Sequence, residues 1–190
     1  MTKYVALLRG INVGGNCKVD MKQLKEILAR KNASTGSSSF QNISTYINSG
    51  NVIFDSTEKD EATLTTDLES ILQKTFGFKI PVVLRSLAQI KKLVQSIPAE
   101  WQNDTEQKTD VLFLWNDYCN KKTLTLIKQT EGVDNLIYAG GSIIWNVDRS
   151  HYTKSGMNKF IGSLVYKHMT ARNVNTVRKL LELMSVAPKS

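Results

Sequence analysis

The sequence predicts an α+β protein: a ferredoxin-like β-α-β-β-α-β half followed by a second β-α-β-β-α-α half. Two observations support this fold class. Strand-like and helix-like segments over residues 3–85 follow the order of the split β-α-β unit. The order β-α-β-β then begins again near residue 111, and two amphipathic segments close the chain. We therefore divide the chain into an N-terminal subdomain, residues 1–97, and a related C-terminal subdomain, residues 98–190.

Residues 3–9 predict a buried strand, because their apolar side chains are nearly continuous. A glycine-rich loop follows at residues 10–16. The next segment predicts a helix with Asp20 as its N-cap and one apolar stripe. This stripe consists of Met21, Leu24, Ile27 and Leu28.

Residues 43–48 and 51–55 predict two strands of a hairpin, joined through the turn signal Asn48-Ser49-Gly50-Asn51. The apolar spacing of residues 64–76 predicts the second helix of this half. Residues 80–84 predict its last strand, and Pro81 places that strand at a sheet edge or at its own first positions.

A further helix closes the first half and ends at Pro98, and a polar connector over residues 99–109 leads to the second half. Residues 111–115 predict a strand, and residues 120–130 a helix. Strands are then expected at 133–138 and 142–147, because Ala139-Gly140-Gly141 between them is a hairpin signal.

Two helices are expected to close the chain. The first carries an apolar stripe from Met157 to Val165, and the second a stripe from Val174 to Met184 with Asn173 as its N-cap. We expect both stripes to be core rather than partner-binding faces, since amphipathic helices usually bury their stripe internally.

Three motifs resemble a family of domains of unknown function, the family numbered 1697. They lie at residues 4–15, 46–54 and 170–176, so the resemblance runs along nearly the whole chain. The resemblance implies a ferredoxin-like α+β fold, in agreement with the element order, and it implies no activity, substrate or catalytic residue. In the third motif this chain has Val174 where family members often have an aromatic residue.

Composition narrows the class of protein. The chain has 190 residues, of which 41% are hydrophobic and 22% charged, which argues against disorder, collagen or a disulfide scaffold. Neither a membrane-spanning run nor a signal peptide is predicted. Because Cys17 and Cys119 are far apart and in no pairing motif, we expect a reducing, cytoplasmic setting. His151 and His168 lack metal-ligand spacing, so no metal or cofactor is predicted.

Positive charge concentrates at the two ends of the sequence. The formal net charge is +8, with seven Lys and Arg against two Asp and Glu in residues 1–50. Residues 149–190 hold eight basic residues and one acidic, whereas residues 98–148 hold four basic and eight acidic. An asymmetry of this kind is typical of proteins with an anionic partner, although lysine-rich solvated helix faces produce it as well.

The candidate ligand-binding residues lie in the three motifs. The loop over residues 9–18 joins a strand to a helix N-terminus, a place that suits anions, but it matches neither the P-loop nor the dinucleotide fingerprint. Simple turn geometry, a hairpin and helix capping are the alternative roles of the three motifs. The candidates are Arg9, Asn12, Gly14, Gly15, Lys18, Asn48, Ser49, Asn51, Arg172, Asn173, Asn175 and Thr176.

The function favoured by these features is binding of nucleic acid or another phosphate-bearing ligand through the basic motif loops. The alternative is a small-molecule-binding protein or enzyme that takes an anionic metabolite in a cleft between the two halves. There Arg9, Lys18 and Arg172 would hold the anion. A third hypothesis is a protein-interaction role through the two closing helices. No catalytic motif is present to identify a reaction, and the oligomeric state is not predicted.

Overall fold

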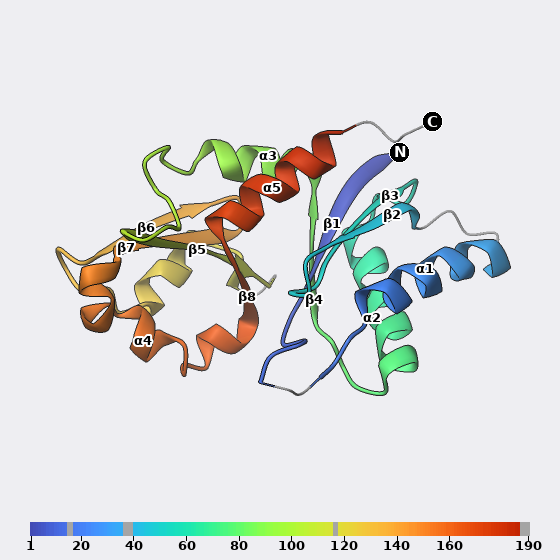
Figure 1. Cartoon of the computed structure of the whole chain (residues 1–190), viewed down its shortest axis with the longest axis horizontal. Coiled ribbons are helices and arrows are strands. Elements are labelled where there is room, and N and C mark those ends of the chain that lie inside the picture. Colours follow the sequence, from blue (N-terminus) through green and yellow to red (C-terminus); the bar gives the residue numbers. More distant parts are fainter. Residues whose placement is uncertain (15–16, 36–39, 116–117, 187–190) are drawn as a thin grey trace. The chain divides into compact units, whose positions relative to one another are not determined.

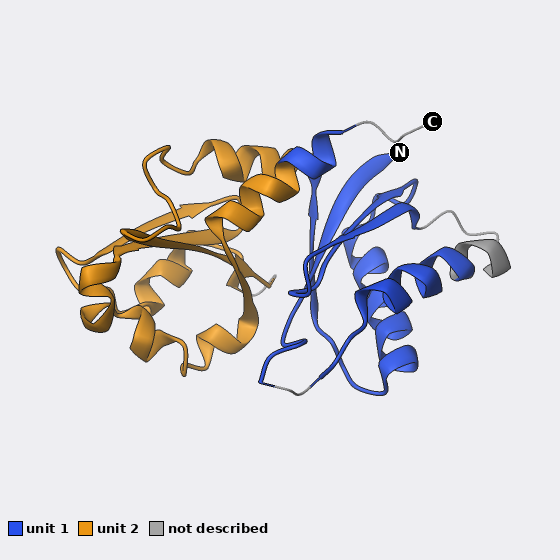
Figure 2. Cartoon of the chain, in the orientation of Figure 1, with its two compact units in different colours: residues 1–87, 182–190 blue, residues 88–181 orange. Residues whose placement is uncertain are grey.

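The computed structural model describes residues 1–14, 17–35, 40–115 and 118–186. The chain forms two compact units, shown in Figure 2. Unit 1 comprises Met1–Leu87 and Glu182–Ser190, and unit 2 comprises Ala88–Leu181. Among the described residues, no helix is both long enough and apolar enough to cross a membrane.

Unit 1 has the predicted β-α-β-β-α-β order. Its antiparallel sheet has the strand order β2-β3-β1-β4, so β1 lies between β3 and β4. This is the arrangement of the split β-α-β unit. The elements are β1 (Thr2–Leu8), α1 (Met21–Thr35), β2 (Gln41–Tyr46), β3 (Asn51–Ser56), α2 (Glu61–Phe76) and β4 (Val82–Ser86).

Helices α1 and α2 cover one face of this sheet (Figure 1). Asp20 caps α1 as predicted, because its Oδ1 accepts hydrogen bonds from the backbone N–H groups of Lys22 and Gln23. Gly77 ends α2 in the left-handed conformation, φ 80°, and donates its N–H to the Gln73 carbonyl. The core beneath the helices is formed by Tyr4, Ala6, Leu8, Leu24, Leu28, Val52, Phe54, Leu64, Leu68, Leu72 and Leu84.

Unit 2 repeats this sheet. Its antiparallel strand order is β6-β7-β5-β8, which matches unit 1 strand for strand. The registers correspond too, because Val5 pairs with Arg85 in the first sheet and Val111 with Arg172, at the equivalent position, in the second. The strands are β5 (Gln107–Leu114), β6 (Asp134–Ala139), β7 (Ser142–Asp148) and β8 (Met169–Asn173).

The connections of unit 2 differ from those of unit 1. The β5–β6 connection contains the 3-10 helix η2 (Lys121–Leu126). The β7–β8 connection contains η3 (Arg149–Lys154), the short α4 (Met157–Phe160) and η4 (Val165–His168). Helices α3 (Leu87–Gln95) and α5 (Val174–Ser185) lie on the sheet face opposite α4 (Figure 1).

The α+β class is confirmed, and three details of the second half are corrected. Strand β8 was not predicted, the helix over residues 120–130 is a 3-10 helix, and the helix over 157–165 is only one turn long. Unit 2 begins at Ala88, whereas the sequence division falls after residue 97. The two boundaries differ because α3 packs with unit 2, where Leu93 approaches Gly140 in the β6–β7 turn.

A buried carboxylate holds the irregular part of unit 2 in place. Asp134 accepts hydrogen bonds from Trp145 Nε1 at 2.9 Å, from the Ser155 hydroxyl, and from the backbone N–H groups of Thr130 and Gly156 at 2.7 and 2.8 Å. These four bonds join the start of β6 to β7 and to the segment before α4. The corresponding connection of unit 1 holds the longer helix α2.

Candidate functional site

Two of the three sequence motifs meet in unit 1. The Asn12 side-chain amide donates to the carbonyl of Asn48 at 2.9 Å and to that of Val19 at 3.0 Å. Its oxygen accepts the Val19 backbone N–H at 2.9 Å. One asparagine of the loop therefore contacts both Val19, just before α1, and the β2–β3 turn.

The backbone in this region favours glycine and asparagine for steric reasons. Gly10, Asn12 and Gly14 have φ values of 71°, 54° and 60°, in the left-handed region that L side chains rarely adopt. Gly50 has φ 80°, and a Cβ there would lie 2.7 Å from both Leu8 Cβ and Ile11 Cδ1. The glycines thus allow the turn to pack directly against the loop.

An open pocket of about 530 Å³ lies where the two segments meet. Lys18 and Asn48 are exposed at its wall. Asp20 brings a carboxylate to the same wall, but its Oδ1 is engaged by the first N–H groups of α1. An anion would therefore meet Lys18 rather than a vacant helix N-terminus. The lining residues are Asn12, Lys18, Val19, Asp20, Met21 and Asn48.

The other candidates of the first two motifs support the loop instead of facing the pocket. Asn51 is fully buried, and its amide donates to the Tyr46 carbonyl and the Ser49 hydroxyl. The Arg9 backbone N–H donates to the Pro81 carbonyl at 2.9 Å, which ties the end of β1 to the start of β4. Gly15 lies outside the described residues.

The third motif belongs to unit 2, where Arg172 is a buried residue of β8. Its Nη1 donates to the Thr170 hydroxyl at 3.0 Å and to the Ala171 carbonyl at 2.8 Å. Burial lowers the pKa of Arg172 to about 10. The guanidinium is still charged at neutral pH, and the contacts within its own strand solvate part of that charge.

Asn173, Asn175 and Thr176 form the start of α5. The Asn173 Oδ1 accepts the Thr176 backbone N–H at 2.8 Å, so Asn173 is the N-cap that the sequence predicts. The Asn175 amide donates to the Asn103 carbonyl at 2.9 Å. Thr176 is buried, with 6% of its surface exposed.

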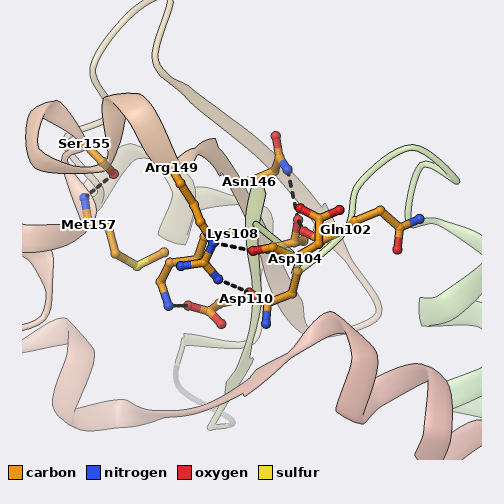
Figure 3. A network of polar contacts seen from close by, with 10 residues as sticks. Gln102, Asp104, Lys108, Asp110, Asn146, Arg149, Ser155 and Met157 are labelled. Carbon is orange, nitrogen blue, oxygen red and sulfur yellow. Dashed lines mark hydrogen bonds and ion pairs between the residues drawn. The ribbon is translucent and has the colours of Figure 1, made fainter. Parts of the chain in front are cut away.

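A polar network around the connector before β5 was not singled out from the sequence. Figure 3 shows Arg149 directed toward Asp104, whose carbonyl accepts the Arg149 Nε–H. The Asp104 carboxylate caps the turn by accepting the N–H groups of Glu106 and Gln107. Arg149 and Asp104 are 45 positions apart in the sequence, so local patterns gave no signal for their contact.

One ion pair belongs to this network. Lys108 Nζ lies 2.9 Å from Asp110 Oδ2 and 5.6 Å from the centre of the Tyr152 ring. Both side chains are largely buried, and each takes a counter-charge or ring in the protein. The network therefore stabilises the connector, and we do not assign it a ligand. Among the described residues, no three His, Cys, Asp or Glu side chains converge as a metal site requires.

Comparisons with known proteins support the fold and leave the activity open. The model of a family described as "protein of unknown function (DUF1697)" matches residues 1–145. A solved structure described as that of the conserved bacterial protein SP0830 from Streptococcus pneumoniae is similar, with a TM-score of 0.80 and 28% sequence identity. That similarity covers 97% of this chain and 99% of the other. No curated protein matches the sequence.

Proposed function

The chain belongs to the DUF1697 family of proteins of unknown function, and we propose that it binds a phosphate-bearing small molecule in the pocket of unit 1. One observation carries this proposal. Two motif segments are joined at a pocket whose wall presents the exposed ammonium of Lys18 beside the exposed Asn48. Lysine is a common phosphate-binding group, and an amide adds a directional hydrogen-bond donor.

The hydrogen bonds of Asn12 support a preformed site. They hold both walls of the pocket without the ligand, so less ordering entropy is lost on binding. The pocket volume of about 530 Å³ falls within the range typical of small-molecule sites. Asp20, in the same wall, disfavours extended polyanions and favours a ligand with a single phosphate group.

The test is calorimetric titration with adenosine 5′-monophosphate and with inorganic phosphate as probes. Lys18→Gln removes the charge and is expected to weaken binding of the nucleotide at least about tenfold, which corresponds to about 1.4 kcal/mol. Lys25→Gln, an exposed lysine of α1 outside the pocket lining, is the matched control and keeps the wild-type affinity. Equal affinities of wild type and Lys18→Gln would refute the proposal.

Nucleic-acid binding is the second candidate, and the net charge of +8 with a pI of about 9.5 favours it. Titration of a short RNA and a short DNA at several salt concentrations tests it, because phosphate contacts make the affinity fall with salt. If Lys18 contacts a backbone phosphate, Lys18→Gln lowers the salt slope by about 1. Binding that does not depend on salt would count against this candidate.

The cysteines bear on the compartment in which the protein works. Cys17 and Cys119 are not joined in a disulfide, and Cys17 is exposed. Exposed thiols persist in reducing compartments, and this supports the proposal that the protein works in the cytoplasm.

A further inference from the structure

A second pocket of unit 1 lies apart from the motif loops. It has a volume of about 700 Å³ and is formed by one face of α2 and by the segment that leads into β4. The α2 residues Thr66, Glu69, Ser70 and Gln73 are spaced three or four positions apart, so they share that face. Lys74, Lys79, Ile80 and Pro81 complete the lining.

The charges of this pocket are unequal. Lys74 and Lys79 are both exposed at its wall, whereas Glu69 is the one carboxylate in the lining. Glu69 Oε1 accepts the backbone N–H of Val82 at 2.8 Å, which fixes the carboxylate against the first residue of β4. The lining thus offers two exposed cations and one anchored anion, a balance that suits a single negative charge.

The remaining surface is mostly apolar. Ile80 is buried to 2% exposure beneath the pocket, and the Pro81 ring, which carries no N–H, lies exposed beside it. Thr66 and Ser70 bring hydroxyl groups to the helix side of the pocket. The Thr66 hydroxyl donates to the Ala62 carbonyl within α2, and Ser70 is exposed. A ligand would therefore place an apolar body over the exposed Pro81 ring, with Ile80 buried beneath it, and an anionic head toward the lysines.

We propose that this pocket binds a monoanionic amphiphile of the medium-chain carboxylate class. Burial of the aliphatic body supplies the larger share of the binding free energy. The lysines select the charged head, and the fixed carboxylate of Glu69 disfavours a head with several negative charges. The site shares no lining residue with the pocket of Lys18.

The probe is octanoate, followed by amide shifts in ¹H–¹⁵N spectra of the full chain. We expect saturable shifts confined to residues 66–82. Octanol, which lacks the charge, and inorganic phosphate, which lacks the chain, each bind at least about tenfold more weakly. Octanol binding as tightly as octanoate, or shifts without saturation, would overturn the proposal.

Variants distinguish octanoate binding in this pocket from binding elsewhere on the chain. Lys74→Gln combined with Lys79→Gln weakens octanoate binding at least about tenfold. Lys22→Gln combined with Lys25→Gln, two exposed lysines of α1, leaves it unchanged. Ser70→Trp retains every charge but fills the pocket from an exposed helix position, and it also abolishes binding. Wild-type affinity in both the double lysine variant and Ser70→Trp would show that octanoate binds elsewhere.

Discussion

Gly156 occupies a position in unit 2 where no side chain fits. A Cβ there would lie 1.8 Å from the Lys128 carbonyl oxygen, and the Gly156 N–H must still reach Asp134. Gly156→Ala is therefore expected to destabilise the protein by about 1–3 kcal/mol or more, as overpacked sites do. Gly162→Ala is the control, since a Cβ there meets nothing within 4 Å. Urea unfolding measures both, and equal stability of the two variants would contradict the account.

Asp134 makes the stability of unit 2 depend on pH. Burial alone raises the pKa of Asp134, but hydrogen bonds from Ser155, Thr130, Gly156 and Trp145 outweigh burial and bring the pKa below its ordinary value. A lowered pKa in the folded state means that the stabilising contribution is present above about pH 4 and is lost as pH falls through the folded pKa.

Asp134→Asn is accordingly expected to destabilise the protein at pH 7, because an amide cannot accept all four hydrogen bonds. The stability difference from wild type should shrink as pH is lowered from 5 to about 2. Denaturant unfolding at both pH values measures it. Asp148→Asn, at an exposed carboxylate, is the control. A difference that stays constant with pH would contradict the role of the Asp134 carboxylate.

At the scale of elements, α5 distinguishes capping from ligand binding in the third motif. Asn173→Ala removes the bond to the Thr176 N–H and is expected to cost about 1 kcal/mol of stability. Asn173→Ser and Asn173→Asp cap equally well and should restore that stability. Thermal unfolding of the three variants provides the measurement. If serine and aspartate fail to rescue, Asn173 acts through something other than the cap.

The elements of unit 1 were predictable because each carries its own local signal. The Asp20 cap, the apolar stripe of α2 and the Asn48–Asn51 turn all depend on neighbours in sequence. Strand β8 was missed because it is a five-residue edge strand with a buried arginine, whereas the helix after its Asn173 cap begins at Val174 as predicted. The 3-10 helix η2 has no side-chain cap hydrogen bond, so α-helical spacing alone was misleading there.

The loops and turns that carry the candidate residues were predictable from the sequence, but the contacts of each residue were not. The motif residues Asn12 and Asn175 bond to partners 36 and 72 positions away, and no local pattern reveals such bonds. Asn12, Asn51 and Asn173 therefore prove to hold the backbone. Lys18 and Asn48 remain as exposed groups at the pocket wall.

At the scale of the whole molecule, the charge excess is shared between the units. By sequence, unit 1 contains 12 Lys and Arg against 9 Asp and Glu, and unit 2 contains 13 against 8. Unit 1 therefore has a net charge of +3 and unit 2 a net charge of +5, so neither unit is as basic as the two ends of the sequence suggest. Bulk charge therefore says less about function than the position of single cations such as Lys18 in a pocket.

Mapping the phosphate site in unit 1 by amide shifts tests the central claim most directly. The full chain, labelled with ¹⁵N, is titrated with adenosine 5′-monophosphate in wild-type and Lys18→Gln forms. The account predicts saturable shifts at residues 12–14, 17–21 and 46–50 in the wild type, around the pocket, and at least about tenfold weaker binding in the variant. Absence of saturable shifts in these segments, or the same affinity in the variant, would contradict it.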